Sequence, residues 1–184
     1  SFSMNYKIDA TVLDAWTDIL KKTPDSVLWL FRTDAVAADN LHREFNARGI
    51  GRDRVIFADR LPKARHLARH RLADLFLDTF AYGAHTTASD ALWTGLPVLT
   101  CRGDTFARRV GASIVKAAGM PELVTETVAD YIANAVGICS TPGRSAALKA
   151  QLAENIPRCP LFSTAAIARN LEAAYLSMIA DLQK

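Results

Sequence analysis

Short apolar runs of strand length alternate along this chain with longer segments of helical periodicity. The apolar runs lie at 26–31, 54–59, 72–80 and 97–101. A strand that is buried on both faces of a sheet has such a continuous apolar sequence. Its alternation with helices favours an α/β fold, in which helices cover both faces of a parallel sheet. One domain of ordinary size accounts for all 184 residues.

Helical periodicity or helix-boundary residues mark most of the remaining sequence. The expected helices span 9–22, 36–48, the residues after Pro62, 86–94, 104–119, 127–138, 143–155 and 163–182. Asp9 is placed to cap the first helix, while Gly49 and Gly119 are placed to end the second and the fifth. The last third is entirely helical, so we expect it to wrap the sheet or to reach toward a missing partner lobe.

Composition and charge disfavour several classes of protein. Half of the residues are hydrophobic and 22% are charged, which is typical of a folded domain rather than a disordered chain. The net charge of +3 is low for a nucleic-acid-binding domain, and no aromatic residues interleave with the basic residues of 60–71. No apolar run reaches ~18 residues and no signal peptide is visible. We therefore expect neither a nucleic-acid partner nor a membrane association.

The three cysteines, Cys101, Cys139 and Cys159, are far apart in the sequence. They form no C-x-x-C pair and no spacing with histidine that is typical of a metal site. Such a sparse set favours a reducing compartment, so we expect a cytoplasmic protein without a bound metal. The first residues, SFSMNYKID, do not resemble a natural beginning, and we expect the chain to be a piece of a longer protein.

In an open parallel sheet, ligands bind beyond the carboxyl ends of the strands. The loops that follow the expected strands are 32–37, 58–63, 79–86 and 101–105. The sequence lacks G-x-G-x-x-G, G-x-x-x-x-G-K-[ST] and G-x-S-x-G, which disfavours dinucleotide, P-loop and serine-hydrolase sites. In the last loop, surface charge or helix capping is the expected role of Arg102 and Asp104.

The stretch 83–98, GAHTTASDALWTGLPV, places two threonines at the start of an expected helix. The first turn of a helix has backbone N–H groups without partners and a positive potential, which suits a phosphate. Asp90 lies about one turn beyond Thr86 and Thr87, where its carboxylate suits a ribose diol. Two small residues before the histidine would keep the approach open. The segment 87–90 also matches the pattern T-x-x-D, which is close to a capping box. The local pattern alone favours this capping role over ligand binding.

A second group of polar residues follows the expected strand at 54–59. Lys63 and His66 lie three residues apart and share a helix face, with Arg69 nearby. The lysine suits a phosphate or ribose oxygen, and the histidine suits a base or a phosphate. Taken alone, such a charge run is more often a solvated face. Lys7, just before the first helix, is by default a surface residue.

Three motifs occur together in the middle of the chain: Pro-Lys-x-x-His at 62–66, His-Thr-Thr-x-x-Asp at 85–90 and Leu-Trp-x-Gly-x-Pro at 92–97. With them the chain resembles the C-terminal catalytic lobe of the O-linked N-acetylglucosamine transferase family, glycosyltransferase family 41. The segments 6–32 and 159–178 are similar to the opening and the end of that lobe. The resemblance implies that 1–184 is a single Rossmann-like lobe of a two-lobed GT-B architecture.

The resemblance implies a UDP-sugar site on this lobe. His85, Thr86 and Thr87 would hold the diphosphate at a helix start, and Asp90 would bind the ribose hydroxyls. Lys7 would neutralise the diphosphate leaving group. The donor is then a substrate, and no metal cofactor is expected.

Three further residues match family positions near the nucleoside. Lys63 would contact the ribose, His66 would lie against the uracil, and Arg69 would be a further basic group near the nucleotide. The family usually carries Asn or Gln where Met4 stands, so a polar contact to the donor is in question at this position.

The implied function of the full protein is transfer of N-acetylglucosamine from UDP-N-acetylglucosamine to Ser or Thr hydroxyls of proteins. The N-terminal lobe and the tetratricopeptide repeats that hold acceptor proteins are missing, so we expect this chain alone to be inactive. The alternatives are an asparagine glucosyltransferase, and a GDP-fucose-dependent O-fucosyltransferase, whose branch tends to carry Glu near the position of Asp90. A non-catalytic nucleotide-binding module, favoured by Met4, and a basic interaction domain using 60–71 are two further classes.

Overall fold

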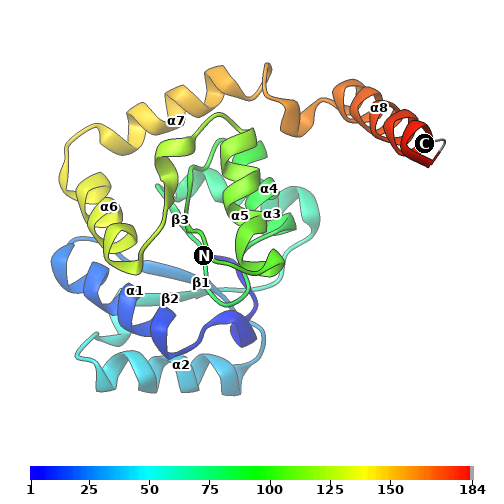
Figure 1. The fold of residues 1–184 in the computed structure, drawn as a ribbon. Helices are drawn as coiled ribbons and strands as arrows, with labels where there is room; N and C mark the ends of the chain where they lie inside the picture. Colours follow the sequence, from blue (N-terminus) through cyan, green and yellow to red (C-terminus); the bar gives the residue numbers. More distant parts are fainter. Residues whose placement is uncertain (183–184) are drawn as a thin grey trace.

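Five short parallel strands form the centre of the computed structural model, which describes residues 1–182 (Figure 1). The strands are β1 (Leu28–Phe31), β2 (Val55–Ala58), β3 (Phe76–Leu77), β4 (Val98–Cys101) and β5 (Val124–Thr125). β1 pairs with β2, and β4 pairs with both β3 and β5, all in parallel. The four strands predicted from the sequence are confirmed, whereas β5 was missed because a two-residue strand has no apolar run of its own.

The described residues form eight α-helices, of which α8 lies away from the strands (Figure 1). They are α1 (Ala10–Lys22), α2 (Ala35–Ala47), α3 (Lys63–Arg69), α4 (Thr86–Trp93), α5 (Phe106–Ala117), α6 (Val128–Ser140), α7 (Arg144–Asn155) and α8 (Thr164–Leu182). Asp9 caps α1, as predicted, by accepting a hydrogen bond from the Val12 backbone N–H at 2.9 Å. The predicted α/β class, with parallel strands flanked by helices, is therefore confirmed.

The strands hydrogen-bond as two sheets, β1–β2 and β3–β4–β5, rather than as one. The amine of Ser1 donates a hydrogen bond to the Trp29 backbone oxygen of β1 at 2.9 Å, and Phe2 packs edge-on against the Trp29 ring. A cavity of about 430 Å³ is lined by residues of both β1 and β3. The N-terminal residues and this cavity thus lie where a continuous sheet would pair β1 with β3.

The predicted strand at 72–80 is much shorter in the structure. Its first residue ends a 3-10 helix, His70–Leu72, and only Phe76–Leu77 are in β3. The chain leaves the sheet after β3 because the buried carboxylate of Asp78 accepts hydrogen bonds from its own loop. The backbone N–H groups of Thr79 and Ala84 each donate to it at 2.7 Å, which makes 79–84 a compact turn.

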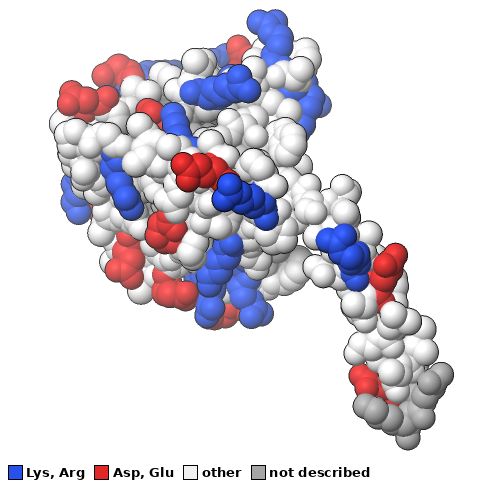
Figure 2. All heavy atoms as spheres, turned by 90° about the horizontal axis from the view of Figure 1, so that it is seen from above, with Lys and Arg blue, Asp and Glu red and all other residues white. Residues whose placement is uncertain are grey.

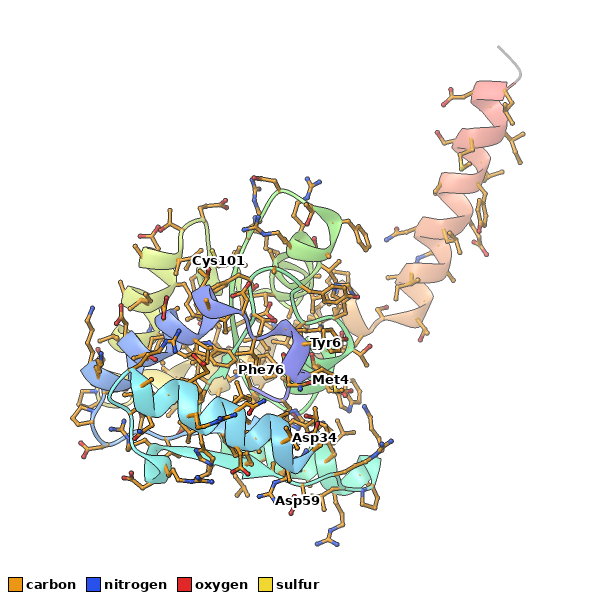
Figure 3. The ribbon with its side chains drawn as sticks, turned by 90° about the horizontal axis from the view of Figure 1, so that it is seen from below. Met4, Tyr6, Asp34, Asp59, Phe76 and Cys101 are labelled. Atoms are coloured by element: carbon orange, nitrogen blue, oxygen red, sulfur yellow. The ribbon has the colours of Figure 1, made fainter. Side chains whose placement is uncertain are left out.

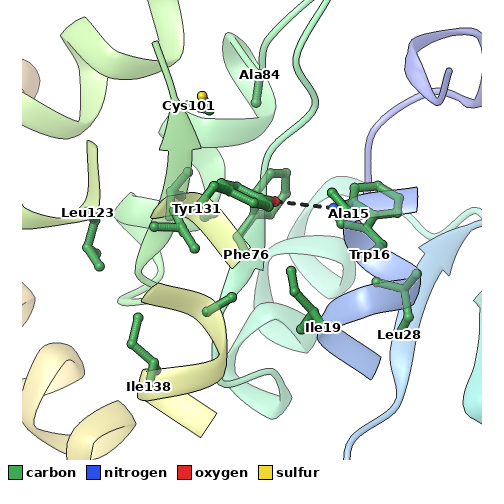
Figure 4. Close-up of a cluster of buried hydrophobic side chains, with 14 of the residues drawn as sticks. Ala15, Trp16, Ile19, Leu28, Phe76, Ala84, Cys101, Leu123, Tyr131 and Ile138 are labelled. Atoms are coloured by element: carbon green, nitrogen blue, oxygen red, sulfur yellow. Dashed lines mark hydrogen bonds between the residues drawn. The ribbon is translucent and has the colours of Figure 1, made fainter. Parts of the chain in front are cut away.

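The hydrophobic core contains a short chain of hydrogen bonds that ends at this loop, and Figure 4 shows the first of them, between Trp16 and Tyr131. Trp16 of α1 and Tyr131 of α6 are both fully buried. The Trp16 indole N–H donates to the Tyr131 hydroxyl at 3.2 Å, and that hydroxyl donates to the Asp78 backbone oxygen at 2.9 Å. Two helices therefore anchor the end of β3 from inside the core.

Helix α8 extends away from the rest of the molecule (Figure 1). None of its residues, Thr164–Leu182, is buried. We expected the helical last third either to wrap the sheet or to reach away from it. Helices α6 and α7 pack against the core, where they bury Tyr131 and Leu152, whereas α8 does not. Among residues 1–182, no helix combines the length and apolar character needed to span a bilayer.

Replacing Tyr131 tests the hydrogen-bond chain. Tyr131→Phe leaves the buried Trp16 N–H and Asp78 carbonyl without their partner, so we expect the free energy of unfolding to fall by about 1–3 kcal/mol. Urea denaturation measures this change. Tyr175→Phe, on the exposed face of α8, is the matched control and is expected to stay within about 0.5 kcal/mol of wild type. Equal stability of the two variants would contradict an anchoring role for the Tyr131 hydroxyl.

Candidate functional site

The predicted site residues lie on three segments that meet beyond the carboxyl ends of β2 and β3. The segments are the N-terminal stretch through the 3-10 helix Asn5–Lys7, helix α3, and the loop into α4 together with the first turns of that helix. Lys63 forms an ion pair with Asp90, and Lys7 donates a hydrogen bond to the Gly83 backbone oxygen at 3.0 Å. The loops 58–63 and 79–86 thus lie at one edge, as predicted. Figure 3 labels Met4 and Tyr6 on the N-terminal segment.

Helix α4 begins without a side-chain cap. Its N-cap residue is His85, whose side chain makes no capping hydrogen bond. The capping-box interpretation is wrong because Thr87 lies inside the helix and the Asp90 carboxylate pairs with Lys63 instead. The backbone N–H groups of Thr86 and Thr87 have no hydrogen-bond partner among residues 1–182. They are therefore available to an external acceptor.

Two side-chain atoms at this helix start are buried and unpartnered within the described chain, the hydroxyl oxygen of Thr87 and Nε2 of His85. Leaving such a group unpaired costs about 1–3 kcal/mol, so a ligand that pairs it gains binding energy. These atoms lie beside the free N–H groups at the positive end of the α4 dipole. The helix start therefore has the donors and the potential of an anion site, and phosphate is the common occupant of such sites.

Lys7 is buried, with 9% of its surface exposed, so the default expectation of a surface lysine is wrong. The 3-10 helix directs its side chain inward, where Nζ lies 4.2 Å from the centroid of the Tyr82 ring as well as bonding to Gly83. Burial lowers the pKa of Lys7, and the Asp78 carboxylate opposes this shift. An ammonium has three donors, so Lys7 has capacity left for an anion at the start of α4.

Asp78 is a residue that the sequence analysis missed. Its fully buried carboxylate accepts hydrogen bonds from the N–H groups of Thr79 and Ala84 and from the Thr100 hydroxyl, each at 2.7 Å. Burial raises its pKa to about 6, while these hydrogen bonds and Lys7 hold the pKa down. The sequence did contain a signal, because a carboxylate inside an apolar run is either exposed or surrounded by donors.

The small residues before His85 serve packing rather than ligand access. Gly83 and Ala84 are both buried, and the Gly83 N–H donates to the Ala107 backbone oxygen of α5 at 3.0 Å. A Cβ on Gly83 would lie 3.3 Å from both that oxygen and the Asp78 carboxylate. The expectation that these residues keep an approach open is therefore wrong, since their small size lets the loop pack against α5.

Lys63 and Asp90 form an ion pair on the solvent-exposed side of the site. The Lys63 side chain is 60% exposed and that of Asp90 is 19% exposed. The carboxylate has two oxygens and the ammonium three donors, so each keeps hydrogen-bonding capacity beyond the ion pair. Together they present an acceptor and a donor side by side, which suits a diol.

His66 is held in its neutral form by its surroundings. Burial lowers its pKa to about 4, and the positive charge of Arg69 adds to the shift. Arg69 donates to Nδ1 of His66 and to the Asp59 backbone oxygen, and its guanidinium lies 4.4 Å from the centre of the Phe2 ring. Because Arg69 can only donate, Nδ1 is the acceptor and Nε2 carries the proton. A neutral imidazole suits stacking on a base rather than pairing with a phosphate.

The fourth predicted loop, 101–105, leads into α5, whose first residue, Phe106, lies edge-on to the His85 ring. Arg102 pairs with Glu126 at 3.2 Å. The N-cap of α5 is Thr105, so Asp104 does not cap that helix. No group of three His, Cys, Asp or Glu side chains in residues 1–182 could hold a metal ion. Figure 2 shows basic and acidic side chains interspersed on one face rather than gathered into a basic field.

A surface cavity of about 680 Å³ lies away from these residues, against the end of α1 and the start of α7. Its lining includes Ser26, which precedes β1, and Leu75, which precedes β3. It therefore lies at the amino ends of the strands and contains none of the unpaired donors found at α4. The unpaired donors at the start of α4, rather than this cavity, therefore mark the candidate site.

Comparisons with known proteins show which family the chain resembles. A model of the family described as Glycosyl transferase family 41 matches residues 1–171. The chain is similar to the "Probable UDP-N-acetylglucosamine--peptide N-acetylglucosaminyltransferase SEC" of Arabidopsis thaliana, with 34% identity over 96% of this chain and 18% of that protein. It is also similar to the "UDP-N-acetylglucosamine--peptide N-acetylglucosaminyltransferase" of Caenorhabditis elegans, with 36% identity over 83% of this chain and 13% of that protein.

A solved structure is similar over nearly the whole chain. It is that of a mutant O-GlcNAc transferase from Thermobaculum terrenum, with a TM-score of 0.92 and 33% identity. The match covers 98% of this chain and 35% of that chain. This chain thus has the fold of one part of that enzyme and spans less than a fifth of the length of the two curated relatives.

The pH dependence of stability tests the burial of Asp78. Unfolded Asp78 releases its proton near the ordinary pKa of 3.8, whereas the folded protein keeps that proton to about 6. Between these values the folded state binds more protons, so raising the pH lowers the free energy of unfolding by up to about 3 kcal/mol. Asp78→Asn removes this titration. We therefore expect the stability of the variant, relative to wild type, to rise by about that amount from pH 4 to pH 7.

Urea denaturation at steps across this range measures the difference. Groups that titrate in both proteins cancel in the comparison, so the slope reports Asp78 alone. Asp104→Asn, at an exposed carboxylate, is the matched control and is expected to change stability by less than about 0.5 kcal/mol. A difference between Asp78→Asn and wild type that does not vary with pH would contradict the environment described for this carboxylate.

Proposed function

The chain belongs to glycosyl transferase family 41, and from that premise we propose that it is the donor-binding lobe of a protein O-N-acetylglucosaminyltransferase. The observation that carries the proposal is the uncapped start of α4. There the N–H groups of Thr86 and Thr87 and the buried polar atoms of Thr87 and His85 lack partners within the described chain. We assign this start to the diphosphate of a UDP-sugar.

The groups beside the proposed diphosphate position indicate where the ribose and the base of the donor would bind. Lys63 and Asp90 present a donor and an acceptor to the ribose hydroxyls. The neutral ring of His66 is the surface for the uracil, and Arg69 fixes that ring while adding positive potential. Met4 is exposed, and its thioether offers no strong hydrogen bond, so we assign no polar contact with the donor to this residue.

The reaction breaks the bond between the sugar C1 and the diphosphate oxygen, and joins C1 to the hydroxyl oxygen of a Ser or Thr acceptor. The hydroxyl proton is released to water. Negative charge grows on the departing UDP. Lys7 and the α4 dipole are fixed before the reaction and stabilise this charge as it develops. The donor is a substrate, and the groups that neutralise its leaving diphosphate belong to this chain.

The acceptor site and a second lobe lie outside residues 1–184 in this proposal. The two curated relatives are much longer than this chain. We infer that the full protein binds both the donor and an acceptor protein, and that this chain alone does not turn over. Its three cysteines are free, which favours a cytoplasmic location.

Nucleotide preference tests the donor assignment. We expect UDP to bind this chain more tightly than GDP or ADP in a calorimetric or NMR titration. Lys63→Ala and Asp90→Ala each remove a charged hydrogen-bonding group, so each is expected to weaken UDP binding about tenfold. Lys22→Ala, at an exposed lysine of α1, is the matched control. Tighter binding of GDP would favour the GDP-sugar alternative, and equal affinity for the three nucleotides would favour a non-catalytic module.

Turnover of the full-length protein tests the role of Lys7. Lys7→Ala removes the ammonium that stabilises the leaving UDP, so we expect kcat for UDP-N-acetylglucosamine and a peptide acceptor to fall about 10²- to 10³-fold. Lys22→Ala should leave turnover unchanged. Full activity in Lys7→Ala would exclude this lysine from the mechanism, while leaving the nucleotide assignment standing.

A further inference from the structure

Tyr82 contacts two of the proposed site residues with one ring. It lies in the loop between β3 and α4 and belongs to none of the three motifs found in the sequence. Nζ of Lys7 lies 4.2 Å from its ring centroid, and the His85 imidazole stacks on it with centroids 5.0 Å apart and planes at 24°. The ring thus links the lysine of the N-terminal segment to the first turn of α4.

The backbone around this ring is fixed on both sides. The Thr79 hydroxyl donates to the Tyr82 backbone oxygen at 2.8 Å. The next residue, Gly83, donates its N–H to the Ala107 backbone oxygen at 3.0 Å and accepts from Lys7. The position of the ring is therefore set by a loop that Asp78 already holds from inside.

His85 depends on this ring because its side chain makes no hydrogen bond with the described residues. Its other ring contact, edge-on with Phe106 at 6.3 Å, is to a side chain that is 79% exposed. A stacked aromatic pair adds stability beyond that of its buried area. Tyr82 is thus the firmer of the two supports for an imidazole whose Nε2 is unpartnered.

Lys7 depends on the same ring for its direction. Its ammonium makes one hydrogen bond, to the Gly83 oxygen, and otherwise faces the π electrons of Tyr82, an attractive arrangement for a cation. Without the ring, the ammonium would keep only the hydrogen bond to Gly83 and the attraction of the Asp78 carboxylate. A lysine must be fixed in advance to stabilise charge effectively.

We propose that Tyr82 is a positioning residue of the diphosphate site, which holds the Lys7 ammonium and the His85 imidazole in place for one anion. The inference rests on the proposed function, because the anion is the diphosphate of the donor. The Tyr82 hydroxyl makes no hydrogen bond with residues 1–182, so the ring alone carries the role. The side chain is 43% exposed, and its replacement does not open the core.

The experiment compares UDP with uridine in NMR titrations of this chain, which measure weak affinities. Uridine reaches only the nucleoside groups, whereas UDP also reaches Lys7 and His85. In Tyr82→Leu we expect the ratio of UDP to uridine affinity to fall about tenfold while uridine affinity stays constant. Tyr82→Phe keeps the ring and should restore the ratio to within about twofold of wild type. Tyr175→Leu, on α8, controls for loss of a tyrosine elsewhere.

The outcomes separate the two proposals. If wild type prefers UDP and Tyr82→Leu keeps that preference, the role of Tyr82 is wrong and the donor site stands. If wild type binds UDP no better than uridine, the diphosphate assignment fails and this inference fails with it. A parallel loss of uridine and UDP affinity in Tyr82→Leu would indicate general damage to the site and would also overturn the positioning role.

A second readout does not depend on nucleotide. The ring currents of Tyr82 act on the side-chain protons of Lys7 and His85, so these signals should move toward their ordinary positions in Tyr82→Leu and stay shifted in Tyr82→Phe. Unchanged signals in Tyr82→Leu would contradict the contacts on which the inference rests.

Discussion

The buried carboxylate of Asp78 is the constraint on which the site depends. A charge removed from water is costly unless donors surround it. Two of its three donors are backbone N–H groups of the loop from β3 to α4, so satisfying this charge fixes the path of that loop. The path brings the Gly83 carbonyl to Lys7 and starts α4 at Thr86. The Tyr131 hydroxyl holds the same residue from the core side.

This support explains how unpaired polar groups persist at the start of α4. A helix end without a cap lowers the stability of the fold, and buried polar atoms without partners lower it further. The loop and the core hold Thr87 and His85 in that state, so their donors need little reorganisation to meet a ligand. The local pattern that favoured a capping box failed here for this reason: the site keeps free the groups that a cap would use.

The positions of helices and strands could be predicted from sequence because they follow from apolar periodicity and from capping residues such as Asp9. The edge at which the loops meet followed from the parallel topology. The burial of Lys7 and its contact with the Tyr82 ring could not be predicted, because they depend on contacts between distant segments. Lys7 and Gly83, for example, are 76 residues apart. The roles at the site came from a resemblance, and the structure adds the contacts that make them physically reasonable.

The free N–H groups of Thr86 and Thr87 are the proposed binding groups for the donor diphosphate, and the other assignments at the site depend on them. The most direct measurement is the backbone amide chemical shift of these two residues as UDP is added, with uridine as the comparison. Hydrogen bonds to phosphate should move both amide protons strongly downfield with UDP and leave them nearly unchanged with uridine. UDP that binds while the Thr86 and Thr87 amides stay at their free positions would contradict the account.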